Sequence, residues 1–268
     1  WSYFPYIHTG DAIMATTDRP MSLAVWQMGM EATVGDPAAV ANKRLQSMQF
    51  SAGGIKTAQQ SVQPQGFKFP TLILLTKEWT ELSVTGMPVY DELGFVFETL
   101  MNRVGITDLT PAETGAHAIE TEYTINTFTA DTFKSMVLEF GSAVRAERYR
   151  AAIFKEFGLN FKRDAIAMSG SVFAKRITDG ITMTVGATPL PLVPILGSQV
   201  GIKFADTYAG LATATWQDRV TEVDWKVTDR FNPFWALNPT QDSYADIIEG
   251  TPKGTMDITI GADVAGMS

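Results

Sequence analysis

Residues with the chemistry of a catalytic centre are scarce in this chain. It contains two histidines, His8 and His117, and no cysteine. A nucleophilic serine on a sharp turn has the spacing Gly-x-Ser-x-Gly, which the nearest match, residues 168–171, does not have. We therefore interpret Ser169 and Ser171 as ordinary strand or turn serines, and His117 as a surface or hydrogen-bonded structural residue. No residue is assigned as catalytic, and we predict that the protein is not an enzyme.

Metal and cofactor sites are not indicated either. Without cysteine, and with its two histidines far apart, the chain cannot form an ordinary zinc site. Asp206, Asp218 and Asp224 lack the spacing of a calcium loop and are interpreted as solvated residues near strand ends. Neither glycine-rich phosphate-binding motif occurs. Paired carboxylates for glycoside hydrolysis are assembled by the fold, and the sequence nominates no such pair. We predict no metal and no cofactor.

The charge of the chain argues against a protein that grips nucleic acid. The formal net charge is −8, from 21 basic and 29 acidic side chains, whereas affinity for phosphates comes from clustered lysine and arginine. The one basic cluster, Arg145–Arg150, contains Glu147 and follows a predicted strand. We interpret it as a solvated loop or a subunit-contact loop rather than as a nucleic-acid patch.

Length and composition are those of a folded protein. The chain has 268 residues, of which 45% are hydrophobic and 19% charged, enough for one large β domain or two small ones. The apolar runs are of strand length, as in Phe69–Leu75, so no membrane-spanning segment is predicted. The N-terminal residues lack the pattern of a signal peptide. Because the chain begins with Trp1 and ends directly after a predicted strand, we expect further segments at its termini.

The spacing of apolar residues predicts one long helix. Between Pro88 and Gly105, seven apolar residues fall on one helical face, with Pro88 suited to the first turn and Gly105 to the C-terminal cap. The seven are Val89, Leu93, Val96, Phe97, Leu100, Met101 and Val104. We expect Leu93→Asp to abolish soluble folding and Glu92→Lys to be tolerated.

Most of the remaining chain has the patterns of β-strands. Residues 1–43 are predicted to be an extended N-terminal arm and interaction segment, and residues 44–268 a β domain. Residues 152–161 and 166–177 are predicted to form a hairpin, residues 188–194 a proline-rich edge or crossover segment, and residues 243–248 a short helical turn. The other predicted strands are 44–50 and 55–62, joined by a turn at Gly53-Gly54, and 80–85, 118–127, 134–140, 195–204, 217–227 and 256–262. The fold class is therefore mainly β, a β-sandwich or partial barrel with one flanking amphipathic α-helix.

The order of these elements resembles the tail tube proteins (major tail proteins) of long-tailed bacteriophages. The resemblance covers roughly residues 44–263 and rests on arrangement rather than on a diagnostic motif. Four segments carry it: residues 82–86 leading into the helix, the strand pair 152–161 and 167–174, the pair 196–206 and 219–227, and residues 254–263. The final strand that the family would have after Asp263 is not present.

The resemblance implies a structural subunit of a virion. Proteins of this family form hexameric rings in which each subunit contributes strands to an inner β-barrel, and the rings stack head-to-tail into a hollow tube that conducts DNA during ejection. The implied partners are further copies of the chain and adjacent tail proteins such as the tape measure, tail terminator and tail tip. DNA would pass through the lumen without specific binding. Assembly would take place in the host cytoplasm, and the localisation would be the viral tail.

Under this interpretation we expect residues 1–30 of the N-terminal arm and the proline-rich bend, residues 189–194, to lie at contacts between subunits. Deletion of residues 1–30 is expected to leave a folded monomer that no longer polymerises.

Three alternatives stay open. The first is the tube protein of a contractile or secretion apparatus. The second is a β-sandwich binding or capsid-decoration module of a virion, in which Trp216, Trp225 and Trp235 would be ligand platforms rather than core or interface residues. The third is an enzyme on a β scaffold. Electron microscopy separates the tube from the module, since only the tube forms rings or filaments.

Overall fold

The computed structural model describes residues 24–109, 118–126, 128–142, 144–207, 209–238 and 243–261. Its elements confirm a mainly β chain with one flanking α-helix. The α-helix is α1, Tyr90–Leu100, and short 3-10 turns occur at Gly197–Gln199 and Ala209–Ala212. The strands are β1 Val25–Met30, β2 Lys43–Arg44, β3 Gln49–Val62, β4 Leu72–Gly86, β5 Asn102–Leu109, β6 Ala118–Thr124, β7 Met136–Gly141, β8 Ala146–Lys162, β9 Ile166–Ala174, β10 Thr178–Ile181, β11 Thr188–Pro189, β12 Val220–Thr228, β13 Phe231–Phe234, β14 Asp246–Glu249 and β15 Lys253–Ile260.

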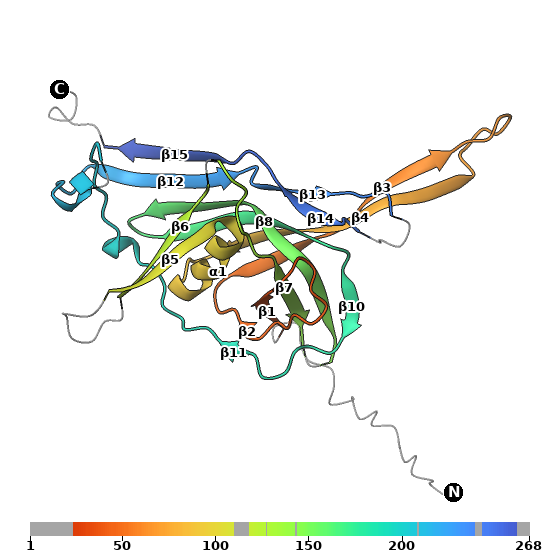
Figure 1. Cartoon of the computed structure of the whole chain (residues 1–268), viewed down its shortest axis with the longest axis horizontal. Helices are drawn as coiled ribbons and strands as arrows, with labels where there is room; N and C mark the ends of the chain where they lie inside the picture. The colour runs from red at the N-terminus through yellow and green to blue at the C-terminus, as the bar shows by residue number, and fades with distance from the viewer. Residues whose placement is uncertain are drawn as a thin grey trace, which may run out of the picture.

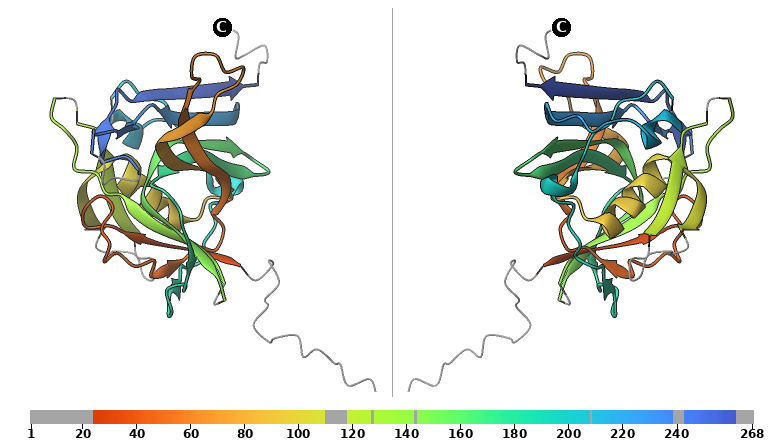
Figure 2. Two further views of the ribbon diagram at one scale, coloured as in Figure 1. Left: turned by 90° about the vertical axis from the view of Figure 1, so that its right-hand side faces the viewer. Right: turned by 90° about the vertical axis from the view of Figure 1, so that its left-hand side faces the viewer.

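Most strands belong to one 11-stranded sheet that curls into a partial barrel (Figures 1 and 2). Its main path is β11-β2-β1-β7-β8-β9-β4-β3, while β10, β12 and β15 join through β8. Strands β1 and β3 are far apart along this path, yet the rings of Trp26 and Phe50 lie 5.1 Å apart. The curl therefore brings distant strands of one sheet together around a shared core.

Strand β8 holds the two parts of the sheet together. Its first half pairs with β7 and β10, and its second half pairs with β9 on one side and β12 on the other. Ala151, near the middle, has a φ of 51°, a left-handed conformation that costs a non-glycine residue about 1–2 kcal/mol. The buried Glu31 carboxylate accepts a hydrogen bond from its N–H at 3.0 Å, and the Tyr244 hydroxyl donates to its carbonyl at 2.7 Å. These bonds hold the strand at its bend.

Helix α1 supplies apolar side chains to the main core, as its sequence pattern predicts. Val89, Leu93, Val96 and Leu100 are buried, and the Phe97 ring packs edge-on against Phe157 at 6.2 Å. The helix is shorter than predicted, because it ends at Leu100 and not near Gly105.

The early end of α1 has a clear structural cause. Met101 has an extended backbone, with its N–H donated to the Phe97 carbonyl, and Asn102 already begins β5, which pairs with β6. A strand partner thus replaces the last predicted helical turn.

The opposite face of β8 and β9 carries a second core, which the β13–β14 hairpin covers. Phe173, Phe231 and Tyr244 are buried there. Trp235 on the same hairpin packs against Trp79 of β4, with the rings 5.8 Å apart.

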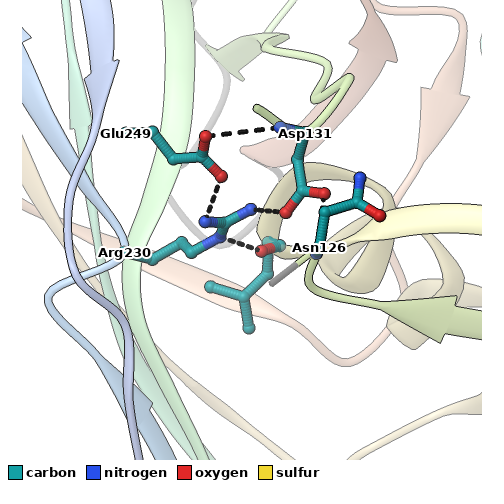
Figure 3. A network of polar contacts seen from close by, with 5 residues as sticks. Asn126, Asp131, Arg230 and Glu249 are labelled. Atoms are coloured by element: carbon teal, nitrogen blue, oxygen red, sulfur yellow. Dashed lines mark hydrogen bonds and ion pairs between the residues drawn. The ribbon is translucent and has the colours of Figure 1, made fainter. Parts of the chain in front are cut away.

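A buried ionic network fastens this hairpin to α1 (Figure 3). The Arg230 guanidinium, 1% exposed, pairs with Asp131 and Glu249. Its Nε donates to the Leu100 carbonyl at 3.1 Å, and the Asp131 carboxylate accepts the N–H of Asn126 at 2.9 Å. Arg230 therefore places a positive charge at the C-terminal end of α1, where the helix dipole favours it.

Several predicted strand boundaries were wrong for local reasons. Gly53-Gly54 is a bulge within the continuous strand β3, not a turn. Residues 243–248 are not helical, because Tyr244 and Ile247 point into the second core and residues 246–249 pair with β13. Residues 195–204 form an irregular segment in which Gly197 packs against the end of the β8–β9 hairpin, where a Cβ would lie 2.2 Å from the Lys162 carbonyl oxygen.

The first part of the chain contributes to the core. Residues 1–23 of the predicted arm lie outside the described residues, but Val25–Met30 form β1, which pairs with β7. Trp26 and Met28 are buried. Deletion of residues 1–30 would therefore remove a core strand, so the expectation that it leaves a folded monomer was wrong.

Glu92 is a buried anchor and not a surface residue. It is 0% exposed, and its carboxylate accepts the backbone N–H groups of Gln46, Ser47 and Met48 at 2.5, 3.0 and 2.8 Å. These N–H groups cannot join a ladder, which is why the predicted strand over residues 44–50 is interrupted. The expectation that Glu92→Lys is tolerated was wrong, because a lysine offers no acceptor to these donors.

We expect Glu92→Ala to lower the free energy of unfolding by about 3 kcal/mol, because it leaves buried donors without an acceptor. Urea unfolding measures this change. Asp91→Ala is the matched control: Asp91 is exposed in the first turn of the same helix, and its loss should cost about 0.5 kcal/mol through the helix dipole. Equal effects of the two variants would contradict the anchoring role.

The bend in β8 should make stability depend on pH through Glu31. Burial raises the pKa of the Glu31 carboxyl above its ordinary value of 4.5, although hydrogen bonds from Ala151, Ser135 and Gly35 act against the shift. The folded state therefore binds this proton more tightly than the unfolded state. The resulting stabilisation is fully present below pH 4.5 and is lost as the pH rises through the pKa of Glu31 in the folded state. We expect the stability advantage of the wild type over Glu31→Gln to shrink as pH rises above 4.5, measured by urea unfolding. An advantage that grows with pH would contradict this.

Candidate assembly interface

Outside the part that the β13–β14 hairpin covers with the second core, one face of the sheet is polar and open to solvent. The strands β3, β4, β9, β8, β12 and β15 lie side by side, each antiparallel to the next. Side chains alternate between the faces, so apolar residues such as Leu82, Val84 and Met168 point towards the core with α1. The register places polar or small residues on the opposite face: Gln49, Ser51, Ser83, Thr85, Ala167, Ser169, Ser171, Gly158, Asn160, Glu222, Asp224, Lys226, Thr255, Asp257 and Thr259. We call this set the polar face.

The charges of the polar face are mostly acidic near β15. Glu222 pairs with Lys162 at 3.0 Å. Asn160, which donates to Glu222 at 2.7 Å, and Lys162 hold the pKa of its carboxyl below the ordinary value. Asp224 and Asp257 stand directly opposite each other on β12 and β15. Like charges in such a cross-strand position are destabilising, so this pair does not add to the stability of a single molecule.

The same run of strands ends in two edges without a strand partner in the described part of the chain. Strand β3 pairs only with β4, and β15 pairs only with β12. Free edges of this length expose backbone N–H and C=O groups that can pair with another chain. The run has an even number of antiparallel strands, so β3 and β15 point in opposite directions. Copies related by rotation about an axis along the strands can therefore join β3 to β15 as a further antiparallel pair.

The second candidate contact is a β-hairpin arm that projects from the body (Figure 1). Strand β4 pairs with β9 only over residues 80–86, so residues 72–79 pair with β3 alone. Its tip and outer strands expose large apolar side chains on both sides. These are Val62 (40% exposed), Phe67 (59%), Phe69 (68%), Leu72 (49%), Ile73 (64%), Leu74 (44%) and Leu75 (54%). A two-stranded ribbon cannot bury both of its own faces, so this arm is suited to contact with another molecule.

The third candidate contact is an exposed apolar surface around the proline-rich bend. The Tyr90 N–H donates to the Val193 carbonyl at 3.3 Å, and the Ile195 N–H donates to the Pro88 carbonyl at 3.0 Å. The bend therefore lies beside the start of α1, and β11 within it pairs at the edge of the sheet with β2. The exposed members of this surface are Met87, Tyr90, Leu192, Val193 and Leu196.

The residues considered for chemistry do not converge on a site. His8 and His117 lie outside the described residues. Ser169 and Ser171 lie on the polar face, as does Asp224, whereas Asp206 and Asp218 are exposed in the segment before β12. Among the residues that the structure describes, no three acidic or histidine side chains form a group able to hold a metal ion. The described helices include none long and apolar enough to cross a bilayer.

The basic cluster Arg145–Arg150 is not a loop, because residues 146–150 begin β8. Its arginines have internal partners. Arg145 pairs with Asp179, Arg148 pairs with Glu139 at 2.6 Å, and Arg150 donates to the Asp36 carbonyl at 2.5 Å. Two of these partners, Asp179 and Asp36, come from segments distant in the sequence, so short-range patterns could not indicate them.

The three tryptophans have different surroundings. Trp225 and Trp235 are half-buried against the two cores. Trp216 is 61% exposed, with the Lys203 ammonium 4.4 Å from its ring centroid.

Two substitutions on β4 test whether the arm contributes to the stability of a single molecule. We expect Ile73→Asp to change the free energy of unfolding by no more than about 0.5 kcal/mol, because this side chain is already in solvent. Leu82→Ala, on the same strand but 1% exposed, should cost about 2–5 kcal/mol. Urea unfolding of both variants makes the comparison. A large loss from Ile73→Asp would mean that the arm packs within its own subunit.

Comparison with known proteins gives no family assignment. No protein-family model matches the sequence, and no curated protein matches it. The candidate function therefore depends on three features: the polar face, the two free edges and the apolar arm.

Proposed function

We propose that the chain is a structural subunit that assembles into hexameric rings, and that these rings stack into the hollow tail tube of a long-tailed bacteriophage. The observation that carries this proposal is the antiparallel run from β3 to β15, which has an open polar face and two free edges of opposite direction. An edge of one copy can pair with the other edge of the next copy, and a ring would leave neither edge of this run unpaired.

The two faces of this run suit a tube wall. The face with α1 carries the main core and would be turned away from the lumen, while the polar face would line it. Asp224 and Asp257 would then form an acidic surface repeated in every copy. Negative charge repels the phosphates of duplex DNA, so DNA would pass through the lumen without being held.

The exposed apolar surfaces suit contacts along the tube. The arm of β3 and β4 and the surface around the proline-rich bend, residues 189–194, remain exposed in one subunit. Head-to-tail stacking buries such surfaces against a different part of the next copy and continues without limit. The ends of the tube would be completed by adjacent tail proteins such as the tape measure, tail terminator and tail tip, and the assembled protein would reside in the virion.

Electron microscopy of the purified protein tests the proposal directly. We expect rings and hollow filaments, because the free edges and apolar surfaces favour self-association at high protein concentration. Dispersed monomers at every concentration would reject the tube and favour a binding or capsid-decoration module.

Reversal of charge on the polar face tests which surface lines the lumen. We expect tubes of the double variant Asp224→Lys, Asp257→Lys to retain a short DNA duplex in a co-sedimentation assay at low salt, and to release it as the salt concentration rises. Wild-type tubes should retain none.

The matched control changes the same number of charges elsewhere. Asp91→Lys with Asp206→Lys replaces two exposed aspartates that do not belong to the polar face and should leave DNA retention at the wild-type level. Equal DNA retention by both double variants would contradict the proposal that Asp224 and Asp257 line the lumen.

A further inference from the structure

An apolar hollow of about 400 Å³ lies between α1 and the β12–β15 edge of the sheet. Its walls include Phe97 and Met101 of α1, Phe161 of β8, Trp225 of β12 and Met256 of β15. Its one hydroxyl, that of Tyr123, donates to the Gly94 carbonyl at 3.3 Å. The surface of the hollow is therefore almost entirely apolar and is suited to apolar groups.

The size and rim of the hollow define its occupant further. An apolar cavity of about 150 Å³ holds one benzene molecule, so about 400 Å³ has room for two aromatic or aliphatic side chains. Met256 at the rim is 58% exposed, and Phe97 and Trp225 meet at 6.2 Å with their rings at 66°. An edge-to-face aromatic pair with an adaptable methionine beside it readily accepts a further aromatic ring.

The same chain carries a matching occupant. Phe67 and Phe69, at the tip of the arm, are 59% and 68% exposed and lie two residues apart. The arm projects at one end of the long axis of the molecule, whereas α1, β12 and β15 lie towards the other end (Figure 1). A subunit therefore cannot fill its own hollow with its own arm.

We propose that the hollow beside α1 receives the arm tip of a second copy, with Phe67 and Phe69 as the inserted side chains. This inference rests on the proposed function, since it identifies the surface that the arm contacts when subunits stack. Every copy has one tip and one hollow at opposite ends, so the contact is heterologous and extends from copy to copy. It buries the exposed aromatic residues of the arm and the exposed rim of the hollow in a single step.

Engineered cysteines test the contact without background, because the native chain has none. The variant Phe69→Cys, Met256→Cys carries one cysteine on the tip and one on the rim. Under mild oxidation of the assembled protein, we expect a ladder of disulfide-linked dimers, trimers and longer chains on a denaturing gel.

Two controls define this result. Either single-cysteine variant can form dimers at most. Phe69→Cys combined with Val185→Cys, a residue that is 90% exposed and outside the hollow, should give no ladder. A ladder of equal strength from this pair would overturn the proposal.

A charge introduced at the rim of the hollow tests whether this contact is needed for stacking but not for ring formation. We expect Met256→Lys to fold normally, because Met256 is exposed, and to form rings that no longer stack, as seen by electron microscopy. Normal tubes from Met256→Lys, with no ladder from the cysteine pair, would overturn the inference and leave the proposed function standing. A wild-type protein that forms no rings would refute the proposed function, and a ladder would then establish the tip contact alone.

Flotation of the wild type with phosphatidylcholine–phosphatidylglycerol vesicles, lost in Phe69→Ser but kept in Met256→Lys, would assign the tip to a lipid surface instead.

Discussion

The bend in β8 is the constraint on which the rest of the fold depends. A straight strand of this length could serve only one flat sheet, but the left-handed conformation at Ala151 divides it into two halves with different partners. The cost of that conformation is offset by hydrogen bonds from buried groups, since Glu31 accepts the N–H and Tyr244 binds the carbonyl. These two residues come from opposite ends of the described chain, so the bend also fastens the N-terminal strand and the β13–β14 hairpin to one point.

Division of β8 determines which parts of the sheet are covered or paired within one molecule. Around its first half, β1 and β7 curl over the core, and the β13–β14 hairpin closes the outer face through Arg230. Around its second half, α1 covers only one face. The other face stays polar, and the edges at β3 and β15 stay unpaired among the described residues. The sheet is thus covered on both faces around the first half of β8, whereas around the second half one face and two edges remain exposed.

Local periodicity was enough to predict part of this structure. The hairpin of β8 and β9, the strands near β12 and β15, and the apolar face of α1 follow from patterns within a few residues. Predictions failed where a distant partner outweighed the local pattern. Glu92→Lys was expected to be tolerated, yet Glu92 is buried and its carboxylate accepts the backbone N–H groups of residues 46–48. Gly53-Gly54 has the composition of a turn, but continuous pairing with β4 makes it a bulge.

The candidate assembly surfaces were harder to predict, because the sequence does not distinguish an apolar side chain that is buried within the molecule from one that is exposed on its surface. Leu82 and Leu74 lie on one strand and are chemically identical, yet the first is 1% exposed and the second 44%. Only the end of pairing between β4 and β9 separates them. Solvent exposure of so many large side chains on a ribbon without a core is unfavourable for an isolated molecule. We therefore propose a single explanation for the arm, the hollow beside α1 and the two free edges: they are contact surfaces of a chain that assembles with further copies of itself.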